Sequence, residues 1–228
     1  MRVVRAVGEA GVLLEWRDLP ESLAGRKARA VSAHLDRRPP RGLREWILGA
    51  RSILAVFDPG LFDEPAFVAA AAAWENDFAS IPAGATHEIP VCYGGSAGID
   101  LEELAAERGL SPEAFAQMHS SAEYRVSFLG FAPGFAYLTG LPGTLASPRL
   151  AAPRVHVPWG SVAIGGPYTG IYPETGPGGW KLIGRSPAPL FEVGRDSPAL
   201  LSPGDVVRFV PIEEWKFAAL AASRGGRA

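Results

Sequence analysis

The sequence predicts an α+β fold, with a small α+β domain over residues 1–83 and a domain of short strands over residues 84–228. Three observations carry this prediction. The first third of the chain alternates strand-like and helix-like apolar patterns. The segment Ser80–Gly84, which contains Pro and Gly, is typical of a domain boundary. From Arg125 onward, short apolar runs alternate with Gly/Pro turns, a pattern typical of β-barrels and β-sandwiches.

The N-terminal domain has the predicted order ββ-α-ββ-α, which favours two helices packed on one face of an antiparallel sheet. The turn Gly8-Glu9-Ala10-Gly11 between two apolar runs indicates a hairpin. An apolar stripe that repeats with the helical period indicates each helix. The predicted strands are Val3–Val7, Val12–Trp16, Arg44–Leu48 and Ser52–Phe57, and the predicted helices are Glu21–Leu35 and Glu64–Phe78.

The C-terminal domain is predicted to begin with a strand over His87–Tyr93, followed by two short helices. Asp100, with Glu103 three residues later, fits a capping box at the start of the first helix. Ser111 and Pro112 fit the N-cap and first residue of the second helix. Strands and turns then continue to Val206–Pro211, and a last helix is predicted over Glu213–Ala222.

Composition excludes several classes of function. The net charge of −2 provides no overall attraction to nucleic acid or to acidic membranes. The two short helices predicted within residues 100–120 have the spacing of a helix-turn-helix but are too acidic to bind DNA. The only cysteine, Cys92, cannot form an internal disulfide, which favours a reducing compartment. No apolar run approaches the roughly 18 residues that span a bilayer, and no signal-peptide pattern precedes the first strand. We therefore expect a cytoplasmic protein with no membrane contact.

The segment Gly130–Arg185 is the most unusual part of the chain. Its 56 residues contain 12 Gly and 8 Pro, yet they are also rich in aromatic and β-branched residues. This mixture indicates packed strands joined by constrained turns. Glu174 is its only carboxylate, against four Lys and Arg side chains. A weakly positive, glycine-lined surface suits an anion or a polarised carbonyl better than a cation.

Backbone N–H groups and cations in this segment are candidates for anion binding. Gly178 and Gly179 lie in the run Gly176-Pro177-Gly178-Gly179, which either directs N–H groups at an oxyanion, with Lys181 nearby, or forms a tight strand connection. Arg149 and Arg154 flank a proline-stiffened segment, where they either hold a carboxylate or phosphate or form surface ion pairs.

Other candidates are less specific. Tyr137, Tyr172 and Trp180 either line a small-molecule pocket or belong to the core. Ser161 is either a hydroxyl donor or a strand-edge serine, and His119 ends a helix, where a cation is favoured by the helix dipole. The four histidines and single cysteine lack metal-ligand spacing, so no zinc site is predicted. A GxxxxG run at Gly165–Gly170 lacks the Lys-Ser/Thr of a phosphate loop.

Five motifs follow one another in an order that a known family shares. They are Phe128–Leu138, Pro153–Ile164, Gly170–Pro173, Pro177–Arg185 and Pro203–Phe209. Together they resemble the 5-oxoprolinase B subunit, a family also called PxpB or KipI and formerly known as the first of the two allophanate hydrolase subunits. The chain departs from the family at Gly95–Leu101, where Ser96 stands in place of a glutamate in the relatives' usual G-E-F-G-P-D-L.

The resemblance implies a cyclophilin-like β-barrel behind the small α+β domain. It also implies one part of a hydrolase complex, which works with a homologous C component (KipA-like) and an A component (LamB/YcsF-like). Together these cleave 5-oxo-L-proline to L-glutamate at the expense of ATP with Mg, and this chain is expected to be inactive without them. Two alternatives remain: a KipI-like inhibitor that binds a sensor histidine kinase, and half of a carboxyltransferase domain, which would need a biotin carrier.

This activity suggests roles for the candidate residues. Phosphorylation of the lactam oxygen gathers negative charge that N–H groups and cations can stabilise. We therefore predict Arg154, Lys181 and His119 as catalytic residues, with Arg149 or His119 receiving the substrate carboxylate. The predicted substrate-binding residues are Arg149, Gly134, Tyr137, Ser161, Tyr172, Gly178, Gly179 and Trp180. No resident metal site is predicted in this chain.

Overall fold

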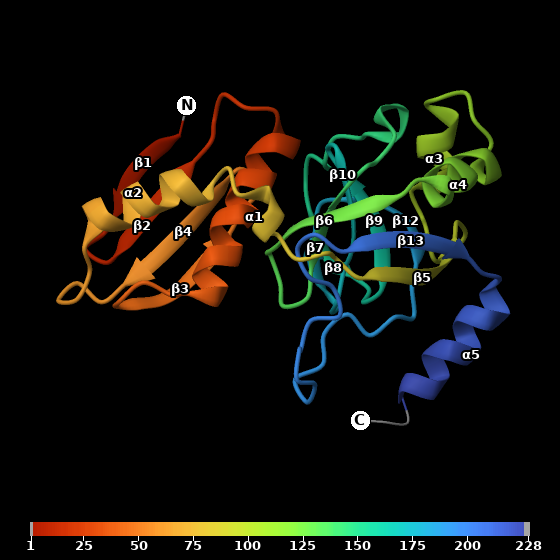
Figure 1. Cartoon of the computed structure of the whole chain (residues 1–228). Helices are drawn as coiled ribbons and strands as arrows, with labels where there is room; N and C mark the ends of the chain where they lie inside the picture. The colour runs from red at the N-terminus through yellow and green to blue at the C-terminus, as the bar shows by residue number, and fades with distance from the viewer. Residues whose placement is uncertain (1, 226–228) are drawn as a thin grey trace. The chain divides into compact units, whose positions relative to one another are not determined.

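A computed structural model describes residues 2–225. The chain divides into two compact units, one ending at Ala83 and the other beginning at Gly84 (Figure 1). The predicted combination of a small α+β unit and a β-barrel is confirmed. Within the described part of the chain, every helix is too short or too polar to cross a membrane.

The N-terminal unit is a four-stranded antiparallel sheet, in the order β1-β2-β4-β3, with two helices packed against it. Alternate residues of β2 and β4 are buried, so one face of the sheet forms the core with the apolar sides of both helices. The elements are β1 (Val3–Val7), β2 (Gly11–Glu15), α1 (Glu21–Arg37), β3 (Leu43–Leu48), β4 (Ser52–Phe57) and α2 (Glu64–Trp74). The predicted order ββ-α-ββ-α is confirmed.

The second helix ends earlier than its alanine-rich pattern predicts. α2 stops at Trp74, and a short 3₁₀ helix, η1, follows over Phe78–Ser80. Asn and Asp are poor residues for a helix interior because their side chains hydrogen-bond elsewhere. Asp77 does so here, since its carboxylate lies 2.9 Å from Nε2 of His34.

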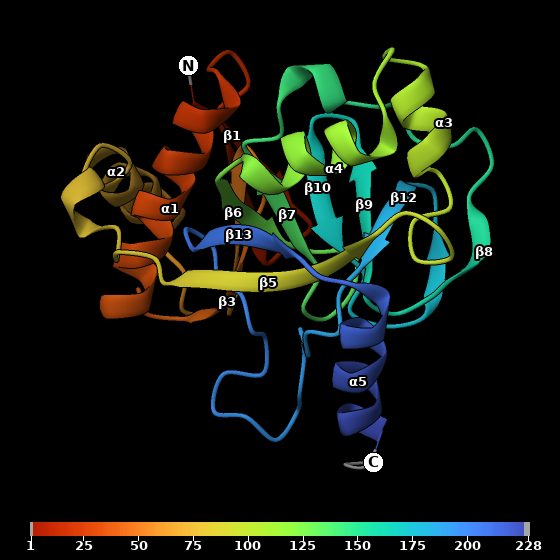
Figure 2. The same ribbon diagram turned by 90° about the vertical axis from the view of Figure 1, so that its right-hand side faces the viewer.

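The C-terminal unit is a closed seven-stranded barrel in the order β10-β7-β6-β13-β5-β12-β9, and Figure 2 shows several of these strands crossing beneath α4. A separate two-stranded sheet pairs β11 with β8. The strands are β5 (Thr86–Tyr93), β6 (Tyr124–Leu129), β7 (Ala136–Thr139), β8 (Arg154–Val157), β9 (Ser161–Gly165), β10 (Tyr168–Ile171), β11 (Gly176–Gly178), β12 (Lys181–Arg185) and β13 (Val206–Pro211).

The barrel closes through a parallel pairing of β13 with β5. Asp205, which comes directly before β13, fixes the start of this pairing. Its carboxylate accepts hydrogen bonds from the backbone N–H groups of Ala85 and Ser202, both at 2.8 Å, and lies 3.0 Å from Nε2 of His87. One buried side chain thus joins the beginning and the end of the unit.

Two short helices, α3 (Leu101–Ala106) and α4 (Pro112–Ser121), follow β5. The predicted cap of α4 is confirmed, because Oγ of Ser111 accepts a hydrogen bond from the N–H of Ala114 at 3.2 Å. The predicted capping box of α3 is wrong. Asp100 occupies the N-cap position, but its side chain makes no capping hydrogen bond, because it binds groups of β8 and β12 instead.

A helix, α5 (Glu214–Gly225), follows β13. Phe217 of α5 stacks on Trp159, with ring centroids 6.5 Å apart. The guanidinium of Arg185 lies 5.2 Å from the centre of each of these two rings. The first turns of α5 are therefore attached to the barrel by a cation held against two aromatic rings.

Candidate functional site

Several of the predicted substrate-binding residues meet around the ring of Tyr172. Tyr172 follows β10 and packs edge-on against Phe135, with centroids 5.4 Å apart. Trp180 packs edge-on against Phe135 and Tyr137, at 5.3 and 5.5 Å. We call Phe131, Phe135, Tyr137, Tyr172 and Trp180 the aromatic cluster. Tyr172 and Trp180 are almost fully buried, which agrees with the alternative that these two residues belong to the core.

Glycines make room for this cluster. A Cβ atom at Gly178 would lie 2.4 Å from Oη of Tyr172, and one at Gly165 would lie 2.4 Å from the Trp180 ring. Gly134 has a φ of +80°, and a Cβ there would lie 2.8 Å from Cβ of Phe191. These glycines allow close packing beneath the cluster rather than flexibility.

The glycine run before Trp180 forms a strand. Gly176 pairs with Val157, and Gly178 pairs with Arg154, so this run is β11 and joins β8. The carbonyl of Gly179 accepts a hydrogen bond of 2.7 Å from the N–H of Leu150. The run had two alternative roles, a set of N–H groups directed at an oxyanion or a strand connection, and the structure agrees with the strand connection.

Arg149 lies at the cluster with an uncommitted guanidinium. Its Cζ is 5.8 Å from the centre of the Trp180 ring, and the side chain is exposed. Among residues 2–225, no carboxylate pairs with it. Burial raises the pKa of the Tyr172 hydroxyl, and the charges of Arg149 and Arg154 act in the opposite direction. The guanidinium group of Arg149 is thus available to bind a carboxylate or a phosphate.

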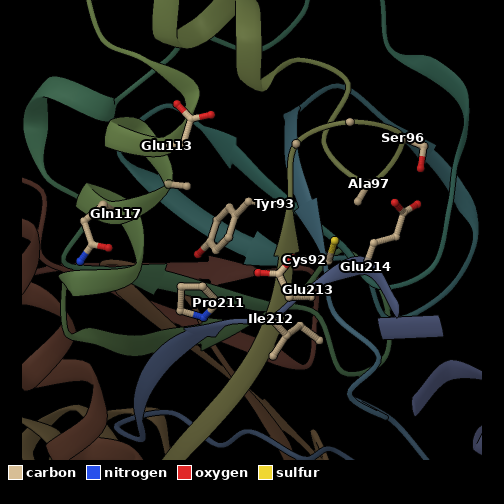
Figure 3. Close-up of a pocket in the computed structure, with 13 residues that line it drawn as sticks. Cys92, Tyr93, Ser96, Ala97, Glu113, Gln117, Pro211, Ile212, Glu213 and Glu214 are labelled. Carbon is tan, nitrogen blue, oxygen red and sulfur yellow. The ribbon is translucent and has the colours of Figure 1, made fainter. Parts of the chain in front are cut away.

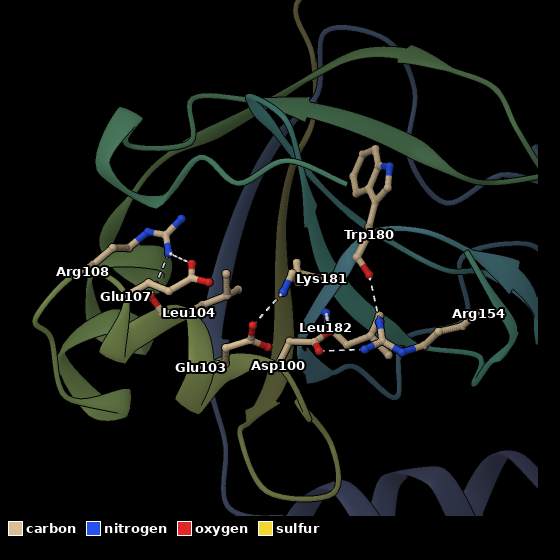
Figure 4. A network of polar contacts seen from close by, with 9 residues as sticks. All are labelled: Asp100, Glu103, Leu104, Glu107, Arg108, Arg154, Trp180, Lys181 and Leu182. Carbon is tan, nitrogen blue, oxygen red and sulfur yellow. Dashed lines mark hydrogen bonds and ion pairs between the residues drawn. The ribbon is translucent and has the colours of Figure 1, made fainter. Parts of the chain in front are cut away.

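Arg154 is committed to Asp100. Its Nη2 donates to Oδ1 of Asp100 at 2.7 Å, and its Nη1 donates to the carbonyl of Trp180 at 3.4 Å (Figure 4). Oδ2 of Asp100 accepts the N–H of Leu182 at 2.6 Å. For Arg154, therefore, the ion-pair alternative holds, while its contact with Trp180 keeps it beside the aromatic cluster.

Asp100 is a site residue that sequence reasoning missed. It is nearly buried, and both of its carboxylate oxygens are used. A signal was present, because Asp100 is the aspartate of the family motif G-E-F-G-P-D-L, which the chain keeps although it departs at Ser96. Because Asp100 also fits the cap position of a helix, the neighbouring residues already accounted for it, and the ion pair with the distant Arg154 was not predicted.

Lys181 and Ser161 lie next to the cluster but have other partners. Nζ of Lys181 lies 3.3 Å from Oε1 of Glu103 on α3, as Figure 4 shows. Oγ of Ser161 donates to the carbonyl of Pro158 at 2.7 Å, and the backbone carbonyl of Ser161 accepts a hydrogen bond from the N–H of Tyr172 at 2.9 Å. Ser161 is fully buried, which agrees with the structural alternative for this residue.

His119 lies in the barrel core. Its ring is fully buried and stacks on Phe209 at 4.8 Å. Oγ1 of Thr169 donates to the carbonyl of Ala163 and lies 2.9 Å from Nε2 of His119, so Nε2 carries the proton. Nδ1 then accepts from the hydroxyl of Tyr93 at 2.8 Å. Burial lowers the pKa of His119 to about 3, so the ring is neutral.

A hollow of about 410 Å³ lies at the end of β5 (Figure 3). Its charged lining residues are Glu113, Glu213 and Glu214, and it also contains Cys92 and Ser96. None of the predicted site residues lines it. Tyr93 connects this hollow to the core of the barrel, because the Tyr93 hydroxyl is hydrogen-bonded to His119.

The aromatic cluster and its two arginines suit a small organic anion. A free guanidinium can hold a carboxylate, and aromatic faces and edges can contact an apolar ring. The site does not suit a magnesium ion, since Asp100 has both oxygens occupied. Among the residues described, no group of three or more His, Cys, Asp or Glu side chains could hold a metal.

The chain consists of a small α+β unit that is followed in the sequence by a β-barrel unit. The family model described as carboxyltransferase domain, subdomain C and D, matches residues 1–201, and the chain belongs to this family. The predicted resemblance to the 5-oxoprolinase B subunit is also confirmed. The protein of that name from Escherichia coli O157:H7 is 55% identical over 141 residues, which are 62% of this chain and 65% of that protein.

Two further comparisons agree. The 5-oxoprolinase B subunit of Bacillus subtilis (strain 168) is 52% identical over 127 residues, covering 56% of this chain and 53% of that protein. The chain thus spans between half and two thirds of the length of these two relatives. The crystal structure of TTHA0988 superposes with a TM-score of 0.78 at 36% identity, covering 92% of this chain and 40% of that one.

Proposed function

We propose that the chain is the B component of a multi-subunit, ATP-dependent 5-oxoprolinase that opens 5-oxo-L-proline to L-glutamate. The observation that carries this proposal is the identity of 55% and 52% to two bacterial proteins named as that component. Its partners in the proposal are a KipA-like C component and a LamB/YcsF-like A component. We place the assembly in the cytoplasm, in keeping with the single cysteine.

The aromatic–arginine site supports this proposal through its fit to the substrate. 5-Oxoproline is a small ring with one carboxylate and one lactam carbonyl. Arg149 has a free guanidinium for the carboxylate, and the aromatic cluster provides apolar surface for the ring. Arg154, oriented by Asp100, can direct its remaining N–H groups at the carbonyl oxygen, which gains negative charge when the carbon is attacked.

Ring opening consumes one water. The water oxygen joins the carbonyl carbon, the C–N bond breaks, and the nitrogen takes a proton to leave the amino group of glutamate. The candidate site does not fit Mg–ATP, because its carboxylate, Asp100, has both oxygens occupied and the GxxxxG run lacks the phosphate-loop lysine. We therefore propose that the partner proteins bind the nucleotide.

Reconstitution tests the proposal. The chain, mixed with the KipA-like and LamB/YcsF-like proteins from the same genome, should release glutamate from 5-oxoproline only when ATP and all three proteins are present. Absence of release from the complete set, with each protein folded, would show that the proposed activity is wrong.

The role of Arg149 has its own test in the active complex. Arg149→Ala should raise KM by roughly tenfold to a hundredfold, since a charged hydrogen bond to substrate is lost. Arg149→Lys should recover part of this loss. The exposed Arg125, whose side chain is 57% accessible, provides the matched control, and Arg125→Ala should leave KM unchanged.

A further inference from the structure

Phe131 has an unusual backbone conformation beside the aromatic cluster. Its φ is +72°, and among residues 2–225 it is the only residue other than glycine with a positive φ. The N–H of Ala132 donates to the carbonyl of Gly130 at 2.9 Å. Phe131 is thus the central residue of a γ-turn with positive φ, the strained form of this turn. Such a conformation costs free energy and persists only where the surroundings impose it.

The surrounding loop imposes this conformation. The N–H of Gly130 donates to the carbonyl of Phe135 at 3.1 Å, and the N–H of Phe135 donates to the carbonyl of Ala132 at 3.0 Å. Pro133 fixes one more φ angle. Gly134 packs so closely on the neighbouring segment that a Cβ atom would lie 2.9 Å from the carbonyl oxygen of Leu190. The turn is therefore formed before any ligand arrives.

Burial of the Phe131 ring does not offset the strain. The residue is 63% exposed, and its ring touches Phe135 and Tyr172 only edge-on, with centroids 5.4 and 6.0 Å away. A large apolar side chain that is both strained and exposed lacks a folding role that would explain it. The turn holds the aromatic ring of Phe131 rigidly at the edge of the aromatic cluster. The same cluster contains Trp180, and the free guanidinium of Arg149 lies over the Trp180 ring.

We propose that Phe131 is a substrate-contacting residue that covers the apolar face of a small cyclic carboxylate whose charge Arg149 receives. This inference rests on the proposed function, in which the ligand is 5-oxoproline. That ring has two adjacent methylene groups, and burying them is worth roughly tenfold in affinity. Because the turn is preformed, little conformational entropy is lost when the ring is covered.

Two substitutions separate the contact from the strain. Phe131→Ala removes the ring and keeps a side chain at positive φ, whereas Phe131→Gly removes the ring and accepts the positive φ without strain. In the active complex, both variants should raise KM for 5-oxoproline about tenfold, with a much smaller effect on kcat. Thermal unfolding of the full chain should place the glycine variant about 2–4 °C above the alanine variant.

Titration calorimetry of the full chain with 5-oxo-L-proline keeps the two proposals distinguishable. Weaker binding by Phe131→Ala would support the contact even if the reconstituted complex were inactive, in which case only the proposed function would fail. An unchanged KM, or an unchanged affinity of the chain, would overturn the inference. Loss of association with the partner proteins at a normal KM would also overturn it, because Phe131 would then be a contact for one of those proteins.

Discussion

Asp100 and Arg154 form an ion pair of 2.7 Å that joins the start of α3 to β8. The same carboxylate accepts the N–H of Leu182, and the N–H of Asp100 donates to the carbonyl of Leu182 at 2.9 Å. Three segments that are far apart in the sequence are therefore held by one residue. Since Arg154 also reaches the carbonyl of Trp180, this pair determines where a positive charge lies beside the aromatic cluster.

The first prediction concerns this pair. Asp100→Asn should lower the free energy of unfolding by about 2 kcal/mol, because charge-assisted hydrogen bonds are lost from a nearly buried group. It should also lower the turnover of the assembled complex at least tenfold, since Arg154 loses its orientation. Urea unfolding and glutamate release measure the two effects. Glu107→Gln is the control, because Glu107 pairs with Arg108 at an exposed position and should change neither quantity.

The second prediction is a pH dependence that arises from His119. Its pKa is about 3 in the folded chain, because the ring is buried, against about 6.5 when exposed. The unfolded chain therefore binds one more proton between these values, so stability is full above pH 6.5 and falls as the pH is lowered toward 3. Between pH 7.5 and 4.5 the loss should be about 2–3 kcal/mol.

His119→Gln isolates this contribution. The free-energy difference between wild type and variant should narrow by about 2–3 kcal/mol as the pH falls from 7.5 to 4.5, in urea unfolding at each pH. A constant difference would show that His119 titrates normally. Turnover of the variant at neutral pH would separately test the predicted catalytic role.

The third prediction uses two glycines of one strand. Gly178→Ala would bring Cβ to 2.4 Å from Oη of Tyr172, so the ring or β11 must shift. We expect a loss of about 1–3 kcal/mol in the free energy of unfolding, with a raised KM. Gly176→Ala is the matched control, since a Cβ there would meet nothing within 4 Å. Equal stability of the two variants would mean that β11 moves freely at Tyr172.

The fourth prediction concerns the N-terminal unit. Glu75 accepts hydrogen bonds from Nε1 of Trp16 at 3.0 Å and from Nη1 of Arg2 at 3.1 Å, and it lies 3.4 Å from Nζ of Lys27. Glu75→Ala would leave these partly buried donors without this acceptor. We expect a loss of about 2–3 kcal/mol in the free energy of unfolding, measured by circular dichroism in urea. Glu45→Ala, at an exposed position of β3, should cost less than about 0.5 kcal/mol.

Local patterns were sufficient for most of the elements. Alternating burial in β2 and β4 and the N-cap of α4 by Ser111 follow from neighbouring residues, and a sequence shows neighbours directly. The helix end at Trp74 was missed because Asp77 finds its partner, His34, on another helix.

The site was less accessible to prediction, because its geometry depends on distant partners. The prediction of a cap at Asp100 failed because the carboxylate binds Arg154, which lies 54 residues further on, and makes no hydrogen bond to the helix. The run that contains Gly178 had two explanations, and only its pairing with β8, a distant segment of the chain, distinguishes them. Phe131 had no sequence signal at all, because phenylalanine is not a residue that favours positive φ.

The pairing of β13 with β5 has a consequence for how the barrel forms during synthesis. Ala85 and Asp205, which begin that pairing, are 120 residues apart. A contact of this span is slow to form, and β5 leaves the ribosome with both edges unpaired well before β13 exists. The last step in ordering the barrel therefore follows translation of residue 211, and until then the exposed strand edges are sites where a chaperone, or another nascent chain, can bind.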